Sequence, residues 1–265
     1  MRLAVSSVES MNSEPKGARQ MKVFSETNIG LSRKENQDRV RTALMGDDIG
    51  FAVICDGMGG QNAGSEASER AVNIVYERIT KVFRPDYDCN SIRNLLISSV
   101  TTANSVVYDM AISSIEMSGM GTTCVAALVF GGKLFAVNVG DSRLYLINHE
   151  LRQVSKDHTV VMRMYENGEI TKEQMKNHPQ RNYITRAVGV APSVTPDYFE
   201  TEIGENAAVL LYTDGLSNYC DESDIFQIVK KYNSEEVPEL LIKKALASPA
   251  ARTPRWRSAA PTGTP

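Results

Sequence analysis

Residues 121–147 read GTTCVAALVFGGKLFAVNVGDSRLYLI, and this stretch decides the fold class. Its three apolar runs are separated only by Gly131 and Gly132 and then by Gly140 and Asp141. Two-residue glycine turns are typical of β-hairpins, whereas parallel strands need connections of about a dozen residues or more. The stretch therefore predicts three consecutive antiparallel strands, which counts against a dinucleotide-binding α/β fold.

The rest of the chain combines predicted strands with amphipathic helices. Apolar residues recur every fourth position over 63–83, and a second apolar stripe covers 92–110. This spacing predicts two long helices. We also predict strands at 38–44, 50–56 and 207–215 and helices at 221–231 and 235–247.

No internal repeat or linker divides residues 21–247, so one domain is predicted there. Residues 1–20 are mostly polar and aperiodic, and we expect a disordered leader. Residues 248–265 are rich in proline and arginine and contain no Asp or Glu, so we expect a disordered tail.

Length and composition indicate a globular protein. The 265 residues, 42% of them hydrophobic, can bury a substantial core. A net charge of −3 with no long basic run counts against a nucleic-acid partner. The four cysteines are scattered, which predicts reduced thiols, and no apolar run approaches the roughly 20 residues that a membrane helix needs. We expect a cytoplasmic monomer without a membrane partner.

Three predicted strands end in an aspartate: Asp56, Asp141 and Asp214. Strands packed in one core tend to align their ends, so these carboxylates should gather at one rim. Gathered carboxylates repel one another unless a pKa rises or a cation binds. Ligand sets made only of oxygen select Mg²⁺ or Mn²⁺. Each aspartate taken alone is also an ordinary turn residue, but the three together favour a metal site.

Two other phosphate-related hypotheses have weaker support. The segment ICDGMGGQNAG at 54–64 has the glycines of a phosphate loop but lacks the GxxxxGK pattern, which weakens the case for a nucleotide-binding module. None of the four cysteines has an arginine six positions later, as a cysteine phosphatase would require.

Seven motifs occur in order along the chain. They are TNIGLSRKENQD (27–38), VICDGMGG (53–60), MGTTCVAAL (120–128), VNVGDSRLYLI (137–147), SKDHT (155–159), NYITRAVG (182–189) and LLYTDGL (210–216). Together they resemble the bacterial metal-dependent serine/threonine protein phosphatases of type 2C, the PPM family. The resemblance implies an α+β fold, a four-layer α-β-β-α sandwich of two antiparallel sheets flanked by helices.

The resemblance also implies a site for two, or in bacterial members three, Mn²⁺ or Mg²⁺ ions. Asp56 would bridge two of the ions, and the carbonyl of Gly57 would be a further ligand. Asp214 would bind the first ion, and Asp38 would lie near the second ion and act largely through water. Asp141 would help to hold the third, weaker ion.

The implied reaction is hydrolysis of phosphoserine and phosphothreonine in proteins, by attack of a hydroxide that bridges the two ions, without a phosphoenzyme. Arg33 would bind the substrate phosphate in bidentate fashion, although outside this motif we would favour a surface ion pair. Residues 159–180 would form a flap that touches protein substrates. The implied partners are phosphorylated proteins, including a bacterial Ser/Thr kinase and its substrates.

Several positions depart from the family pattern. Met58 and Gln61 stand where relatives often have a histidine, which removes that histidine as a general acid, and Asn28 stands where many have aspartate. The chain's own histidines lie outside that motif, and we interpret them as structural or surface residues: His149, His158 and His178.

The largest departure lies at the end of the chain. Family members close with a GG-x-D-N turn and an apolar strand, and that aspartate binds the first metal. Here residues 248–265 take that place, and no Asp or Glu follows Glu239. Codons for 249–258 can be chosen so that a shifted frame encodes Gly-Gly-Thr-Asp, and we hypothesise an out-of-frame translation. We therefore expect a missing final strand and impaired activity, with a phosphoprotein-binding pseudophosphatase as the alternative function.

Overall fold

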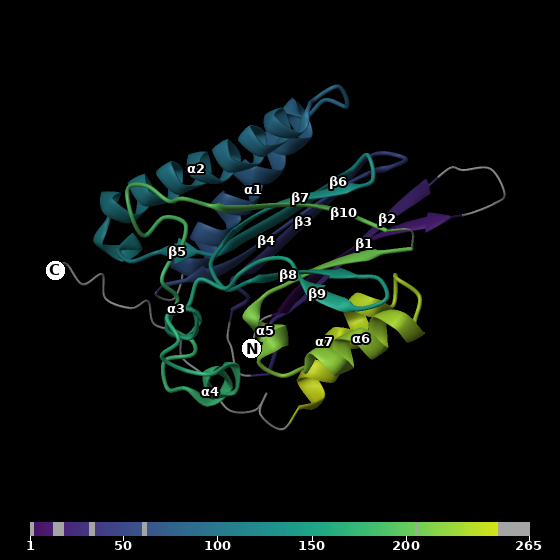
Figure 1. Cartoon of the computed structure of the whole chain (residues 1–265). Coiled ribbons are helices and arrows are strands. Elements are labelled where there is room, and N and C mark those ends of the chain that lie inside the picture. Colours follow the sequence, from purple (N-terminus) through teal and green to yellow (C-terminus); the bar gives the residue numbers. More distant parts are fainter. Residues whose placement is uncertain (1–2, 13–18, 32–34, 60–62, 205, 249–265) are drawn as a thin grey trace.

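The computed structural model describes residues 3–12, 19–31, 35–59, 63–204 and 206–248, and in it two antiparallel sheets lie between layers of helices (Figure 1). One sheet has five strands in the order β2-β1-β11-β8-β9. The other has six, in the order β10-β7-β6-β4-β3 with β5 beside β4. The strands are β1 (Leu3–Asn12), β2 (Arg19–Asn28), β3 (Asp38–Gly46), β4 (Ile49–Met58), β5 (Gly121–Thr122), β6 (Cys124–Phe130), β7 (Lys133–Val139), β8 (Arg143–Ile147), β9 (Leu151–Gln153), β10 (Asp197–Glu202) and β11 (Ala208–Tyr212).

Helices cover the outer face of each sheet. The helices are α1 (Ala63–Val82), α2 (Cys89–Ser113), the 3₁₀ turn η1 (Ile115–Met117), α3 (Val160–Glu166), α4 (Lys172–Asn177), α5 (Asp214–Ser217), α6 (Glu222–Lys231) and α7 (Val237–Ala247). By length and composition alone α2 could cross a membrane, but it packs against α1 and β7 in a buried apolar cluster. Core helices of globular proteins commonly have this character, so α2 is weak evidence for a membrane span.

The alternation of side chains along β4 explains the four layers. Phe51, Val53 and Cys55 point toward one side and pack in a cluster with α1 and α2. Ala52 and Ile54 point the opposite way and pack in a second cluster with residues of the five-stranded sheet. Successive side chains of a strand lie on opposite faces, so a strand that is apolar at every position is buried between two layers. A third cluster packs β8 and β11 against α6 and α7.

The hairpin predicted at 121–139 is confirmed, but the third strand belongs to the other sheet. β6 and β7 pair across Gly131 and Gly132, whose φ angles of 59° and 77° suit a two-residue hairpin turn. β8 pairs with β11 and β9 in the five-stranded sheet. Because β7 already has β6 on one side and β10 on the other, Gly140 and Asp141 carry the chain across to the second sheet.

The expectation of a disordered leader is wrong for residues 3–12 and 19–20. β1 is an interior strand that pairs with both β2 and β11. The alternation of polar and apolar residues in LAVSSVESMN is weak, and the long-range partner β11 is not visible in a local pattern. The predicted tail, from residue 249 on, and the fate of the final strand lie outside the described residues.

We predict that a variant starting at Met21 is less stable than the full chain. It would lack β1, including the five-residue pairing from Val5↔Tyr212 to Glu9↔Ala208. Backbone hydrogen bonds contribute about 1 kcal/mol each, so the free energy of unfolding should fall by on the order of 5 kcal/mol. Urea unfolding would measure this. In the full chain, Ser7→Pro should also destabilise, whereas Ser7→Ala should not, because proline cannot donate to a sheet. Equal midpoints for all variants would contradict the role of β1.

Candidate active site

Asp38 and Asp56 lie opposite each other at one end of the six-stranded sheet. Asp38 begins β3, Asp56 lies near the end of β4, and the two are Cα partners in the antiparallel register. Their exposed fractions are only 1% and 4%. Like charges directly opposite on neighbouring strands are destabilising, so this pair favours a bound cation or a shared proton.

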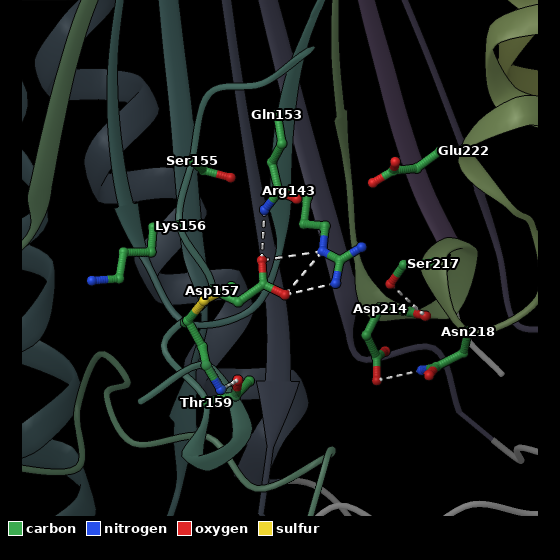
Figure 2. A network of polar contacts seen from close by, with 12 residues as sticks. Arg143, Gln153, Ser155, Lys156, Asp157, Thr159, Asp214, Ser217, Asn218 and Glu222 are labelled. Carbon is green, nitrogen blue, oxygen red and sulfur yellow. Dashed lines mark hydrogen bonds and ion pairs between the residues drawn. The ribbon is translucent and has the colours of Figure 1, made fainter. Parts of the chain in front are cut away.

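A buried hydrogen bond ties Asp38 to the five-stranded sheet. Thr213 follows β11 and is fully buried, and its Oγ1 donates to Oδ2 of Asp38 at 2.7 Å. The next residue is Asp214, whose Oδ2 accepts a hydrogen bond from Nδ2 of Asn218 at 3.0 Å (Figure 2). The end of β11 therefore lies against the acidic end of the other sheet.

Two hydroxyl groups connect Asp141 to Asp56. The backbone N–H of Asp56 donates to Oγ1 of Thr123 at 3.0 Å. The hydroxyls of Thr123 and Ser142 are hydrogen-bonded to each other at 2.8 Å, and Ser142 directly follows Asp141. The structure thus brings the ends of the strands that carry all four predicted aspartates to one end of the sandwich.

The close approach of three chain segments explains Gly57. A Cβ atom at this position would lie 1.9 Å from the carbonyl oxygen of Gly64, at the start of α1, and 2.9 Å from that of Gln37. The Gly57 N–H also donates to the Gln37 carbonyl at 3.0 Å. Only glycine fits here, so packing alone requires the residue that the family resemblance assigns as a carbonyl ligand.

The residues at this end of the sandwich suit a hard divalent cation. Asp38, Asp56, Asp141, Asp214 and the carbonyl of Gly57 would supply only oxygen donors, which Mg²⁺ and Mn²⁺ prefer. Within the described ranges, no group of three His, Cys, Asp or Glu side chains is already arranged to hold a metal. The individual ligand roles therefore stay predictions, and Arg33 lies outside the described residues.

Comparison with known proteins assigns the chain to a family. The family model described as protein phosphatase 2C matches residues 32–247. The chain belongs to the protein phosphatase 2C family. The four-layer α+β sandwich and the family resemblance, both predicted from the sequence, are therefore confirmed.

Individual members of the protein phosphatase 2C family resemble most of the chain. The serine/threonine phosphatase stp of Listeria monocytogenes is 35% identical over 224 residues, which cover 83% of this chain and 87% of that protein. The crystal structure of the serine/threonine phosphatase Stp1 from Staphylococcus aureus has a TM-score of 0.76 at 34% identity and covers 83% of this chain and 86% of that one. The catalytic domain of the phosphatase PstP, solved with two manganese ions, has a TM-score of 0.71 at 27% identity and covers 93% of each chain.

A partly buried ion pair, which was not predicted from the sequence, lies beside the acidic end of this protein phosphatase 2C domain. Nη2 of Arg143 lies 2.7 Å from Oδ2 of Asp157, and Nε2 of Gln153 donates to Oδ1 of Asp157 at 2.8 Å (Figure 2). Burial acts to lower the pKa of Arg143, but the charge of Asp157 raises it overall, so the guanidinium stays charged. The hydroxyl residues Thr123, Ser142 and Thr213 were also missed, although each lies within one of the seven quoted motifs.

His158 is one of the histidines interpreted as structural or surface residues, and it is 4% exposed. Burial lowers the pKa of its imidazole, and the nearby Asp197 offsets this only in part by raising it. The imidazole is therefore neutral at neutral pH. His149, by contrast, is exposed in the turn between β8 and β9.

We predict that Thr213→Val destabilises the metal-free protein. Valine has nearly the same shape as threonine but cannot donate to the buried Asp38 carboxylate. Hydrogen bonds to charged groups contribute about 1.5 to 3 kcal/mol, and the free energy of unfolding should fall by that amount. Denaturant unfolding would measure it, with Thr195→Val at an exposed position as the control. Equal losses in the two variants would contradict the role of this hydrogen bond.

We also predict that His158 makes the stability of the metal-free protein depend on pH. Its pKa is lowered in the folded state, so the unfolded chain takes up this proton first, below about pH 6.5. The stability contribution is complete above about that pH and is lost as the pH falls toward the lowered folded-state pKa. The fall in unfolding free energy between about pH 7 and 5 should be smaller in His158→Asn, which has no titrating imidazole. Parallel pH profiles for the two proteins would refute the assignment.

Proposed function

We propose that this chain is a metal-dependent protein phosphatase that hydrolyses phosphoserine and phosphothreonine. One observation carries the proposal: the strand ends bearing Asp38, Asp56, Asp141 and Asp214 meet at one end of a protein phosphatase 2C domain. Named relatives support the substrate class, since the Listeria protein is a serine/threonine phosphatase. A structural neighbour, PstP, was solved with two manganese ions.

We assign the metal ligands by their positions. The Asp56 carboxylate would be shared by two cations, and the carbonyl of Gly57 would be a further ligand. Asp214 would bind the first cation, and Asp38 would act near the second. Asp141 would contribute to a third site. Bound Mn²⁺ or Mg²⁺ lowers the pKa of water and neutralises charge on the phosphoryl oxygens.

The chain's own hydrogen bonds would keep these carboxylates in place during the reaction. Thr213 donates to Asp38, and Thr123 accepts from the backbone of Asp56. These donors and acceptors are buried, so they need not reorganise as charge develops on the phosphate. Met58 has no acidic proton, so the leaving serine or threonine oxygen must be protonated by water or by another group.

We also propose how the protein recognises its substrates and where it acts. Arg33 would bind the substrate phosphate, and residues 159–180 would contact the protein substrate. The partners would be phosphorylated proteins, among them a bacterial Ser/Thr kinase and its substrates, and the protein would act as a cytoplasmic monomer. The relatives named above are all called phosphatases, and they give no support to the non-catalytic alternative.

We predict that Asp56→Asn abolishes Mn²⁺-dependent hydrolysis of a phosphothreonine peptide. Loss of a carboxylate shared by two cations should reduce kcat/KM by at least about 100-fold, because even an outer partner of a metal ligand contributes about 10- to 100-fold. Chelation should have the same effect on the unchanged chain. Asp109→Asn, at an exposed position on α2, is the matched control and should retain full activity. Turnover that survives chelation would refute the proposed function, and peptide binding without turnover would support the pseudophosphatase.

A further inference from the structure

His158 clamps the peptide groups of Gly140 from two directions. Its Nδ1 accepts a hydrogen bond from the Gly140 N–H at 3.0 Å, and its own backbone N–H donates to the Gly140 carbonyl at 2.9 Å. Nδ2 of Asn138 donates to the same carbonyl at 3.2 Å. Both peptide planes beside the Cα atom of Gly140 are therefore fixed, and the second of these planes leads directly into Asp141.

The orientation of the imidazole is fixed from its far side. Because Nδ1 accepts the Gly140 N–H, the ring proton must lie on Nε2, which is 3.1 Å from Oδ2 of Asp197. The other oxygen of Asp197 is bound by Nη1 of Arg186, which also donates to the carbonyl of Thr195 at 3.0 Å. Burial acts to raise the pKa of Asp197, but the hydrogen bonds from His158 and Arg186 lower it overall, so this acceptor is ionised. A carboxylate on one ring nitrogen selects the tautomer that the other nitrogen needs.

The Gly140 turn has little room to adjust by itself. Gly140 has φ +109°, and a Cβ at this position would lie 2.5 Å from Cγ2 of Thr123. On the other side of Asp141, the hydroxyl of Ser142 is hydrogen-bonded to the hydroxyl of Thr123. Asp141 is therefore held between two fixed neighbours, one fastened by His158 and the other by Thr123.

We propose that His158 is a positioning residue that sets the Asp141 carboxylate for metal binding, with Asp197 and Arg186 orienting the imidazole. The inference rests on the proposed function, because it assigns Asp141 to a metal site. In this proposal His158 binds neither the metal nor the substrate phosphate itself. Its effect on Asp141 passes through the peptide groups of Gly140.

Two substitutions distinguish the contact of Nδ1 with Gly140 from the contact of Nε2 with Asp197. In His158→Asn the amide oxygen lies near the place of Nδ1 and can still accept the Gly140 N–H, but the contact with Asp197 is lost. In His158→Gln the amide lies near the place of Nε2, so Asp197 keeps a donor and Gly140 loses its acceptor. If the Gly140 contact positions Asp141, the glutamine variant should be the more impaired of the two.

The main experiment is titration of the full-length, metal-free protein with Mn²⁺, with free Mn²⁺ measured by electron paramagnetic resonance. We expect His158→Gln to lower the affinity for the most weakly bound Mn²⁺ ion by roughly tenfold. This is the lower end of the effect of residues that hydrogen-bond to metal ligands. His158→Asn should retain most of that affinity. The exposed His149→Gln is the control and should match the unchanged chain.

A double-mutant cycle with Asp141→Asn distinguishes positioning from a general loss of structure. In the Asp141→Asn background, His158→Gln should cause no further loss of Mn²⁺ affinity, because the carboxylate that it positions is gone. An equal loss in both backgrounds would overturn the proposal, and so would equal effects of the asparagine and glutamine variants.

A metal-free measurement keeps the inference separate from the proposed function. Imidazole ¹⁵N resonances of the unchanged chain should show the Nε2–H tautomer, and the Gly140 and Asp141 amide resonances should shift in His158→Gln more than in His158→Asn. An Nδ1–H tautomer would overturn the positioning role. Failure of the unchanged chain to bind Mn²⁺ at all would instead refute the proposed function.

Discussion

Repulsion between two buried carboxylates is the constraint on which the site depends. Asp38 and Asp56 are fixed opposite each other by the register of β3 and β4, so neither can move away without breaking the strand pairing. Burial strengthens the repulsion, because the low local dielectric screens it poorly. The Thr213 hydroxyl donates a hydrogen bond to one oxygen of Asp38 and stabilises its negative charge. A cation would best balance the remaining negative charge of the two carboxylates. Two ionised carboxylates in this arrangement would be costly without metal, and that cost would favour cation binding at the proposed site.

The layered fold provides the stability that such a site needs. β4 buries apolar side chains on both faces immediately before it reaches Asp56, with Val53 and Cys55 on the helix side and Ile54 between the sheets. Each fully buried aliphatic side chain contributes roughly 1.5 to 3 kcal/mol, so the apolar run before Asp56 offsets part of the cost of the repulsion. The strand that carries the central aspartate is therefore among the best anchored in the molecule.

Local patterns in the sequence predict the elements well but not their long-range partners. The helical stripe of α1 and the apolar run of β4 are visible because their periods are short. The sheet to which β8 belongs could not be predicted, because the sequence Gly140–Asp141 is typical of a hairpin turn between β7 and β8. Only the structure shows that β6 and β10 already occupy both edges of β7. Asp56, Asp141 and Asp214 were found because each lies at the end of a predicted strand, whereas Asp38 was assigned from the family resemblance. The hydrogen bonds that support the site were not found, because they join residues far apart in the sequence. Thr213 lies 175 residues from Asp38, and His158 lies 39 residues from Asp197.

The proposed substrate-contacting segment, residues 159–180, is attached to the site without being part of its framework. The chain on either side of the segment is held together, since Thr159 and Ile184 form an antiparallel bridge and the Thr185 N–H donates to the His158 carbonyl at 2.8 Å. Between these ties α3 and α4 begin at their own caps, Thr159 and Thr171. A segment closed on itself in this way can change in sequence without shifting the strands that carry the aspartates. These contacts include His158, so movement of the segment at this point would reach Gly140 through its hydrogen bonds with His158, and Asp141 through Gly140.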